Sequence, residues 1–293
     1  MSARKRKFSS EILPVFQSIQ GQKQTPSFPR YTHILIHIKP ILSEGKRSVW
    51  SSLIADLYKV AALAESITQQ RPRTNKDWLP VADTLDREGV NLWNVSGPIR
   101  GGADDASREV VAALRYAGFR LIEAGLEQKQ FVETLIHVLQ LASKAAASLS
   151  EIGRHDVAAN ILACAAKYEE QLRTAEDTLD IHQQAKAQAV TLYYSSRMEA
   201  AWREGNDGVA DFMLQKITDN DQRLPLLLPR DRESLASKLL EIGKAVLKSA
   251  HQTEPGAARG KYQTAVKWIQ KAFAVIEQSE DVGAAPTLGN LKV

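Results

Sequence analysis

One pattern of glycine and apolar residues occurs three times in this chain and constrains its fold more than any other feature. In each copy, a glycine is followed by a small residue five positions later, a large apolar residue nine positions later and another apolar residue twelve positions later. The copies are Gly153, Ala158, Leu162 and Ala165; Gly205, Ala210, Leu214 and Ile217; and Gly260, Ala265, Ile269 and Ala272. Glycine allows a sharp turn, and a small residue lets a second helix approach the first. The pattern therefore predicts three helical hairpins that turn at the glycines and bury the hairpin alanines (Ala158, Ala210 and Ala265) between their helices.

The middle copy gives the strongest local signal for a turn. Gly205 and Gly208 bracket the turn formers Asn206 and Asp207. Downstream, apolar residues recur at steps of one, three and four, which places them on one face of a second helix. These residues are Val209, Ala210, Met213, Leu214 and Ile217.

Apolar stripes predict helices near residues 48–67, 106–122, 132–149 and 235–247. We also expect helices near residues 81–95 and 154–173, and a long, polar-rich helix from about residue 178 to residue 203. Glycines and a proline around Gly97 and Pro98 predict a loop after the helix near residues 81–95. The segment Tyr31–Leu42 is open between a strand, because isoleucines alternate there, and a helix, which we favour because everything downstream is helical.

Composition divides the chain into four segments. Residues 1–30 combine a basic cluster at Arg4 to Lys7 with three prolines, and we expect a disordered basic tail. The cluster fits a nuclear-import signal or a solvated tail. We expect an N-terminal helical segment over residues 31–105, the repeat array over residues 106–280 and an irregular tail over residues 281–293.

The bulk composition excludes several classes of protein. Hydrophobic residues make up 44% of the chain, which is enough to build a core. The net charge of +4 over 293 residues is too weak to indicate direct nucleic-acid binding. There is one cysteine, Cys164, and no apolar run approaches the length of a membrane span. With no secretory signal either, we expect an intracellular protein that does not associate with membranes.

Motifs that carry chemistry are missing. The stretch Gly256–Tyr262 resembles a phosphate-binding loop, but it is one residue short, places Tyr262 where a Ser or Thr would hold magnesium, and follows no strand. No nucleophile elbow, zinc-protease motif or cysteine pair occurs. We therefore expect no enzyme, no catalytic residue, no cofactor, no metal site and no small-molecule substrate.

The hairpin pattern resembles the second half of a tetratricopeptide (TPR) unit, whose small and aromatic residues are spaced in a similar way. The three glycines are separated by 52 and 55 residues, whereas a TPR repeats every 34 or so. The expected fold is therefore all-α, an α-solenoid of stretched TPR-like helical hairpins, with at most one short strand near Tyr31–Leu42.

Four further motifs resemble a family of meiotic proteins, the Zip-four/Spo-twenty-two family, which includes a mammalian testis-expressed relative. They are Gly89–Asn94 (GVNLWN), Ala201–Gly205 (AWREG), Leu239–Lys244 (LLEIGK) and Ala265–Phe273 (AVKWIQKAF). The motifs follow the order in which that family carries them. The resemblance covers roughly residues 80–280 and is to the N-terminal part of a family whose members are commonly several times longer.

The resemblance implies a non-enzymatic scaffold of stacked repeats in the nucleus, associated with meiotic chromosomes. Such a protein would support synaptonemal-complex assembly, meiotic recombination and crossover formation by binding other crossover factors and proteins of the chromosome axis. Two alternatives stay open. One is a general TPR adaptor that binds peptide segments, and the other is a helical enzyme or a nucleic-acid-binding protein.

In TPR-like pairs the first helix lines the concave face, which suggests where a partner binds. Aligning Gly153, Gly205 and Gly243 with the family pattern predicts six inward-facing residues. They are Gln140, Lys144, Arg203, Glu241, Lys244 and Lys248. Four of the six are basic, which favours an acidic or phosphorylated partner segment. The alternative interpretation is that all six are ordinary solvated side chains.

Overall fold

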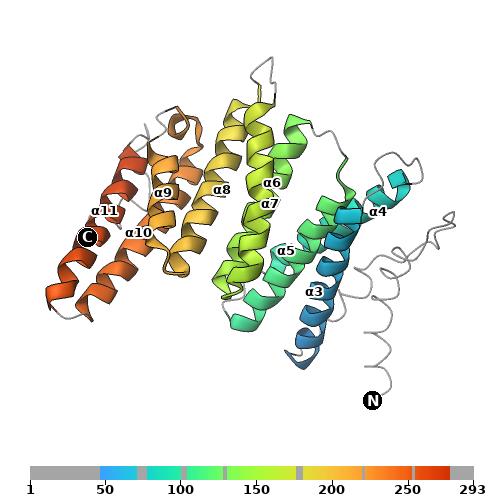
Figure 1. The fold of residues 1–293 in the computed structure, drawn as a ribbon, viewed down its shortest axis with the longest axis horizontal. Coiled ribbons are helices and arrows are strands. Elements are labelled where there is room, and N and C mark those ends of the chain that lie inside the picture. The colour runs from blue at the N-terminus through green and yellow to red at the C-terminus, as the bar shows by residue number, and fades with distance from the viewer. Residues whose placement is uncertain are drawn as a thin grey trace. The chain divides into compact units, whose positions relative to one another are not determined.

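The computed structural model describes residues 47–70, 78–99, 104–127, 131–175, 181–219, 222–252 and 255–277. All regular secondary structure within these residues is helical (Figure 1). The elements are α3 (Arg47–Gln70), α4 (Leu79–Ile99), α5 (Asp105–Gly125), α6 (Val132–Glu151), α7 (His155–Thr174), α8 (Gln183–Arg203), α9 (Asp207–Thr218), the short 3-10 helix η2 (Leu224–Leu226), α10 (Pro229–His251) and α11 (Pro255–Glu277). The predicted all-α class is confirmed for this part of the chain, and consecutive helices pack as in an α-solenoid.

Three of the sequence predictions lie outside the described residues. They are the basic tail at residues 1–30, the strand or helix at Tyr31–Leu42 and the irregular tail at residues 281–293.

The chain divides into two compact units, residues 1–176 and residues 177–293. This boundary falls inside the predicted array of residues 106–280 and does not coincide with the boundary expected near residue 105. Near that expected boundary, α4 packs along α5.

In the first unit, the odd-numbered helices run parallel to one another. Tyr58 of α3 meets Tyr116 of α5 with ring centroids 5.4 Å apart, and further along both helices Glu65 pairs with Arg120. Between α5 and α7, Arg120 and Glu123 contact Cys164 and Tyr168 in the same order. Helices that alternate in direction, with every second one parallel, are the arrangement expected of stacked hairpins.

Helices α4 and α5 pack closely because glycines line both sides of their contact. A Cβ atom at Gly89 would lie 2.7 Å from the carbonyl oxygen of Gly118, and one at Gly118 would lie 2.9 Å from that of Gly89. Two turns away, a Cβ atom at Gly125 would lie 2.7 Å from the carbonyl oxygen of Ala82. The two backbones therefore touch over about two turns, and the contact has no room for side chains.

The second unit shows the same alternation across two hairpins. Gln188 and Glu199 of α8 bond to Asp231 and Lys238 of α10, at 3.0 and 2.7 Å, so these first helices are parallel. The second helices are parallel as well, because two lysines of α11 pair in the same order with an aspartate of α9 and with the aspartate that caps its C-terminus. These pairs are Lys267 with Asp211 at 2.9 Å and Lys271 with Asp219 at 3.3 Å.

Two of the three predicted turn glycines are confirmed. Gly153 and Gly205 have φ angles of +75° and +73°, a conformation that residues other than glycine rarely adopt. In each case the residue after the glycine donates its amide to a carbonyl five residues back, to Leu149 at 2.9 Å and to Ala201 at 2.8 Å. This bond is the signature of a Schellman cap, which ends α6 and α8.

The third predicted turn, at Gly260, is wrong. Helix α11 begins at Pro255, so Gly260 lies inside the helix. A Cβ atom at Gly260 would meet nothing within 4 Å, so its lack of a side chain serves neither a turn nor a close contact. Proline is favoured at the first helical position, and it marks the start of this helix better than the glycine does.

The burial predicted for the hairpin alanines is confirmed, because all three side chains are fully buried. They lie on α7, α9 and α11, each of which packs on the preceding helix. For α11 the contact is direct, since a Cβ atom at Gly243 of α10 would lie 3.3 Å from the carbonyl oxygen of Ala265.

The loop predicted at Gly97 and Pro98 is also wrong, because α4 continues to Ile99. Ser96 explains why the helix does not end at residue 95. It is buried, and its hydroxyl donates to the carbonyl of Trp93 at 2.6 Å. The helix continues through Gly97 and Pro98 although both are exposed, and a proline in the last turn disturbs few backbone bonds.

Candidate partner-binding surface

The six residues predicted to bind a partner all lie on first helices of hairpins. Gln140 and Lys144 belong to α6 in the first unit, and the other four belong to α8 and α10 in the second. Within α10, Glu241, Lys244 and Lys248 are exposed and share one helical face. The structure therefore brings together the three on α10, and the groove predicted to contain all six stays a prediction.

Arg203 on α8 takes part in a structural contact rather than facing solvent alone. It donates to Glu199 at 2.9 Å, and Lys238 of α10 donates to the other oxygen of the same carboxylate at 2.7 Å. Burial would raise the pKa of Glu199, but Lys238 and Arg203 outweigh it and hold that pKa below its usual range. The ionised carboxylate thus joins α8 to α10, and the charge of Arg203 is partly neutralised.

On α6, Lys144 is exposed and Gln140 is half-buried. The turn of α6 that carries Lys144 is tied to α5, because Arg115 of α5 donates to the hydroxyl of Ser148 at 2.7 Å and that hydroxyl donates to the Lys144 carbonyl at 3.0 Å. The backbone beneath Lys144 is therefore fixed while its side chain stays exposed.

Gly243 fixes the spacing of α10 and α11, a role that the sequence did not reveal. A Cβ atom there would lie 2.8 Å from Cγ1 of Ile269 and 3.4 Å from Cβ of Trp268. The two helices approach more closely here than side chains on both would allow. As a result, the turns of α10 and α11 that carry these residues lie side by side.

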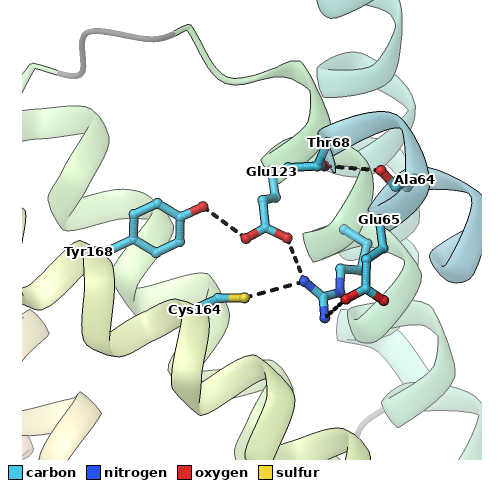
Figure 2. A network of polar contacts seen from close by, with 7 residues as sticks. Ala64, Glu65, Thr68, Glu123, Cys164 and Tyr168 are labelled. Carbon is cyan, nitrogen blue, oxygen red and sulfur yellow. Dashed lines mark hydrogen bonds and ion pairs between the residues drawn. The ribbon is translucent and has the colours of Figure 1, made fainter. Parts of the chain in front are cut away.

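The first unit contains a buried polar cluster, which we call the Arg120 network. Its members are Glu65, Arg120, Glu123, Cys164 and Tyr168. The side chain of Arg120 is only 2% exposed. Its guanidinium donates to Glu123 at 2.7 Å, to Glu65 at 3.2 Å and to the sulfur of Cys164 at 3.4 Å. Figure 2 shows Tyr168 pointing at Glu123 from the opposite side, where its hydroxyl donates at 2.9 Å.

The pKa shifts in the Arg120 network favour a structural role over a role in nucleophilic catalysis. Burial, and then the charge of Glu123, raise the pKa of Tyr168 well above its usual range. The same two causes raise the pKa of the Cys164 thiol. Both groups therefore stay protonated at neutral pH, whereas an activated cysteine needs a lowered pKa. The network connects α3, α5 and α7 through one buried arginine.

Little in the sequence points to the Arg120 network. An arginine among apolar helical residues normally reaches solvent, and Arg120 is buried because Glu65 and Glu123 supply opposite charges from two helices. An acidic residue at position 123, three after the arginine, hints at a pair. The third helix of the network could not have been inferred from spacing.

Other kinds of site are not found among the described residues. They contain no group of three histidine, cysteine or carboxylate side chains arranged to hold a metal ion. No helix in the described part of the chain is long and apolar enough to cross a membrane. The expectations that the chain is not an enzyme and needs no cofactor stay predictions.

The fold defines a class of protein, an all-α solenoid of TPR-like helical pairs. Comparison with known families adds a more particular finding. Residues 200–293 match the family model described as "Meiosis protein SPO22/ZIP4 like". No curated protein and no solved structure matches the chain.

The match confirms the predicted resemblance over residues 200–293 and supports a role in meiosis. It includes the motifs at Ala201–Gly205, Leu239–Lys244 and Ala265–Phe273. In the structure these motifs form the end of α8 and the close contact of α10 with α11. The motif at Gly89–Asn94 lies outside the matched residues, although its glycine forms the close contact of α4 with α5.

Proposed function

We propose that this chain is a non-enzymatic scaffold that binds other proteins in the meiotic nucleus. In this proposal it associates with chromosomes, where it supports synaptonemal-complex assembly and crossover formation. Its partners are other crossover factors and proteins of the chromosome axis. The observation that carries the proposal is the match of residues 200–293 to a family of meiosis proteins.

The geometry of the second unit supports a binding role. Parallel first helices, bonded through Glu199 and Lys238, present successive turns of α8 and α10 side by side. Repeats stacked in this way offer an extended surface rather than one enclosed pocket, and such surfaces suit another protein chain. Lys244 and Lys248 on α10 are exposed, so a partner can reach them without any change in the fold.

The test is a deletion of the gene in its own organism, followed through meiosis. We expect shortened or absent synaptonemal complex and fewer crossovers, while vegetative growth is normal. The tagged protein should lie on chromosomes in meiotic nuclear spreads. Normal synapsis and normal crossover numbers in the deletion strain would contradict the proposal.

A biochemical test addresses the six predicted residues. Lys144, Arg203, Lys244 and Lys248 are reversed to glutamate together, and crossover and axis proteins are captured from meiotic cells. We expect capture to fall. Reversing the exposed Lys144, Lys244 and Lys248 should change stability by only about 1 kcal/mol, whereas Arg203→Glu also places a second negative charge beside Glu199 and should lower stability further. Reversal of Lys244 and Lys248 alone is the control for folding, because Arg203 bonds to Glu199. Undiminished capture by a folded quadruple variant would place the binding surface elsewhere.

A further inference from the structure

Positive charge is concentrated in the last described hairpin. Residues 241–277 contain six lysines and arginines and three glutamates, a net charge of +3, out of +4 for the whole chain. The stretch spans the second half of α10 and all of α11. A charge this dense on two adjacent helices creates a local positive potential that the average composition conceals.

Three of these six cations form ion pairs or hydrogen bonds with other side chains of the protein. Lys267 and Lys271 pair with aspartates of α9 and its C-cap, and Lys261 donates to the hydroxyl of Ser249 at 3.0 Å. For the other three, the structure shows no ion pair with any residue that it describes. They are Lys244, Lys248 and Arg259, and all three are exposed.

These three cations lie on one continuous surface. On α10, Lys244, Lys248 and His251 are separated by four and three residues, so they share a face, which also carries the exposed carboxylate of Glu241. On α11, Arg259, Tyr262 and Val266 share a face for the same reason. The rings of His251 and Tyr262 meet edge to face with centroids 5.6 Å apart, and this contact joins the two rows. We call the six residues other than Glu241 the basic–apolar face.

The apolar members of the basic–apolar face are exposed to solvent. The side chain of Tyr262 is 38% exposed and that of Val266 is 51% exposed. His251 holds its ring against the Leu247 carbonyl at 2.8 Å, which fixes the orientation of the ring beside Tyr262. A surface that combines cations with exposed apolar side chains differs from an ordinary solvated helix face.

We propose that the basic–apolar face binds an acidic, amphipathic segment of a partner protein. This inference rests on the proposed function, because it names the kind of segment that the scaffold receives. Carboxylates of the segment would pair with Lys244, Lys248 and Arg259, and its apolar side chains would cover Tyr262 and Val266. In this mode, apolar residues anchor an amphipathic segment and charges select it.

Nucleic acid fits the same surface less well. Three cations neutralise few phosphates, and affinity for duplex DNA depends steeply on the number of phosphate contacts. The aliphatic side chain of Val266 contributes nothing to a phosphate backbone. A peptide with both charge and apolar surface uses every member of the face.

The test is a selection with purified protein and a random peptide library. Displayed peptides of about 16 residues, or roughly four helical turns, are selected on the full chain. We expect the selected peptides to be enriched in aspartate and glutamate, with apolar residues at helical spacing. Peptides with no acidic excess would overturn the proposal.

Variants show whether the selected peptides use the basic–apolar face. Lys244→Glu, Lys248→Glu and Arg259→Glu together should weaken binding of those peptides by at least about tenfold, and Val266→Ser should weaken it without a change in charge. The matched control reverses three exposed cations elsewhere, Lys167, Lys216 and Arg230, and should leave binding unchanged. Equal binding by the triple variant and the control would overturn the proposal.

Competition with a short DNA duplex distinguishes a peptide site from a nucleic-acid site. If the duplex binds the chain more tightly than the selected peptides do, and loses that binding in the triple variant, the face is a nucleic-acid site and the proposal is wrong. The peptide selection uses no meiotic cells, so its failure is distinct from failure of the proposed function. Acidic selection combined with normal meiosis in a deletion strain would contradict only the proposed function.

Discussion

Replacing Gly89 with alanine should destabilise the first unit, although alanine favours helix formation. A Cβ atom at this position would lie 2.7 Å from the carbonyl oxygen of Gly118 and 2.9 Å from the amide nitrogen of Ile122. Both are backbone atoms, so no change of side-chain rotamer relieves the clash. Helices α4 and α5 would have to move apart by several tenths of an ångström.

The magnitude follows from two opposing effects. Alanine in place of glycine inside a helix stabilises by roughly 0.5–1 kcal/mol. Overpacking a close contact costs about 1–3 kcal/mol, because neighbouring groups along the interface lose contact when the helices separate. We therefore expect a net loss of about 1–2 kcal/mol in the free energy of unfolding of the first unit.

Gly97 supplies the matched control, because it lies in the same helix and a Cβ atom there would meet nothing within 4 Å. Gly97→Ala should leave stability unchanged or raise it by up to about 1 kcal/mol. Only Gly89→Ala places the added methyl group against the backbone of α5. Gly97 precedes Pro98, which disfavours a helical residue with a Cβ atom, so any cost in Gly97→Ala arises within α4 and not from the contact with α5.

The assay must report on the first unit alone, because a chain of two compact units need not unfold in one step. Amide hydrogen exchange of peptides from α4 and α5 meets this need, since protection there follows local stability. Faster exchange in Gly89→Ala than in Gly97→Ala is the expected result. Equal protection in the two variants would show that the glycine contact does not set the helix spacing.

Three further predictions concern the same architecture. Leucine in place of any hairpin alanine should cost about 1–3 kcal/mol, and unchanged melting midpoints for all three would contradict the hairpin packing. Gly260→Ala should raise the melting temperature slightly and Gly205→Ala should lower it, because of these two glycines only Gly205 has a positive φ. The opposite order would indicate that the chain turns at Gly260 after all. Because the pKa of Glu199 is lowered in the folded chain, its stabilisation should be complete above about pH 4.3 and lost as pH falls further. Chemical denaturation across that range should show a weaker acid dependence for Glu199→Gln.

Local signals in the sequence predicted most of the helices and two of the three turns. Gly153 and Gly205 follow apolar stripes that end at them, and both adopt the positive φ that glycine permits. Gly260 is followed by apolar residues at the same spacing, but it lies on an exposed helix face, where an added Cβ atom would contact no other residue. Spacing alone could not separate these two roles, because it records neither the backbone angle nor the distance to other helices.

Contacts between distant helices were the part that sequence could not supply. Arg120 is buried because Glu65, 55 residues earlier, lies beside it. Arg203 was predicted to face a partner, and the structure bonds it to Glu199, which Lys238 also holds. The basic–apolar face was missed for a similar reason, since His251 and Tyr262 meet only when α10 and α11 pack together. Each of these features depends on which helices become neighbours.

Five lysines of the second unit fall into two groups, those paired with carboxylates of other helices or their caps and those exposed without such a pair among the described residues. Reversing the charge of the first group should affect stability, whereas reversing the second group should affect binding. Lys238, Lys267 and Lys271 hold parallel helices together through carboxylates of α8, α9 and the α9 C-cap. Reversing any of them places two like charges in contact at a helix–helix boundary, so stability and binding would fall together. Lys244 and Lys248 are exposed on α10 with no carboxylate paired to them among the described residues. Reversing these two changes the potential of the surface while the stacking contacts persist, so a loss of binding there reports on recognition itself.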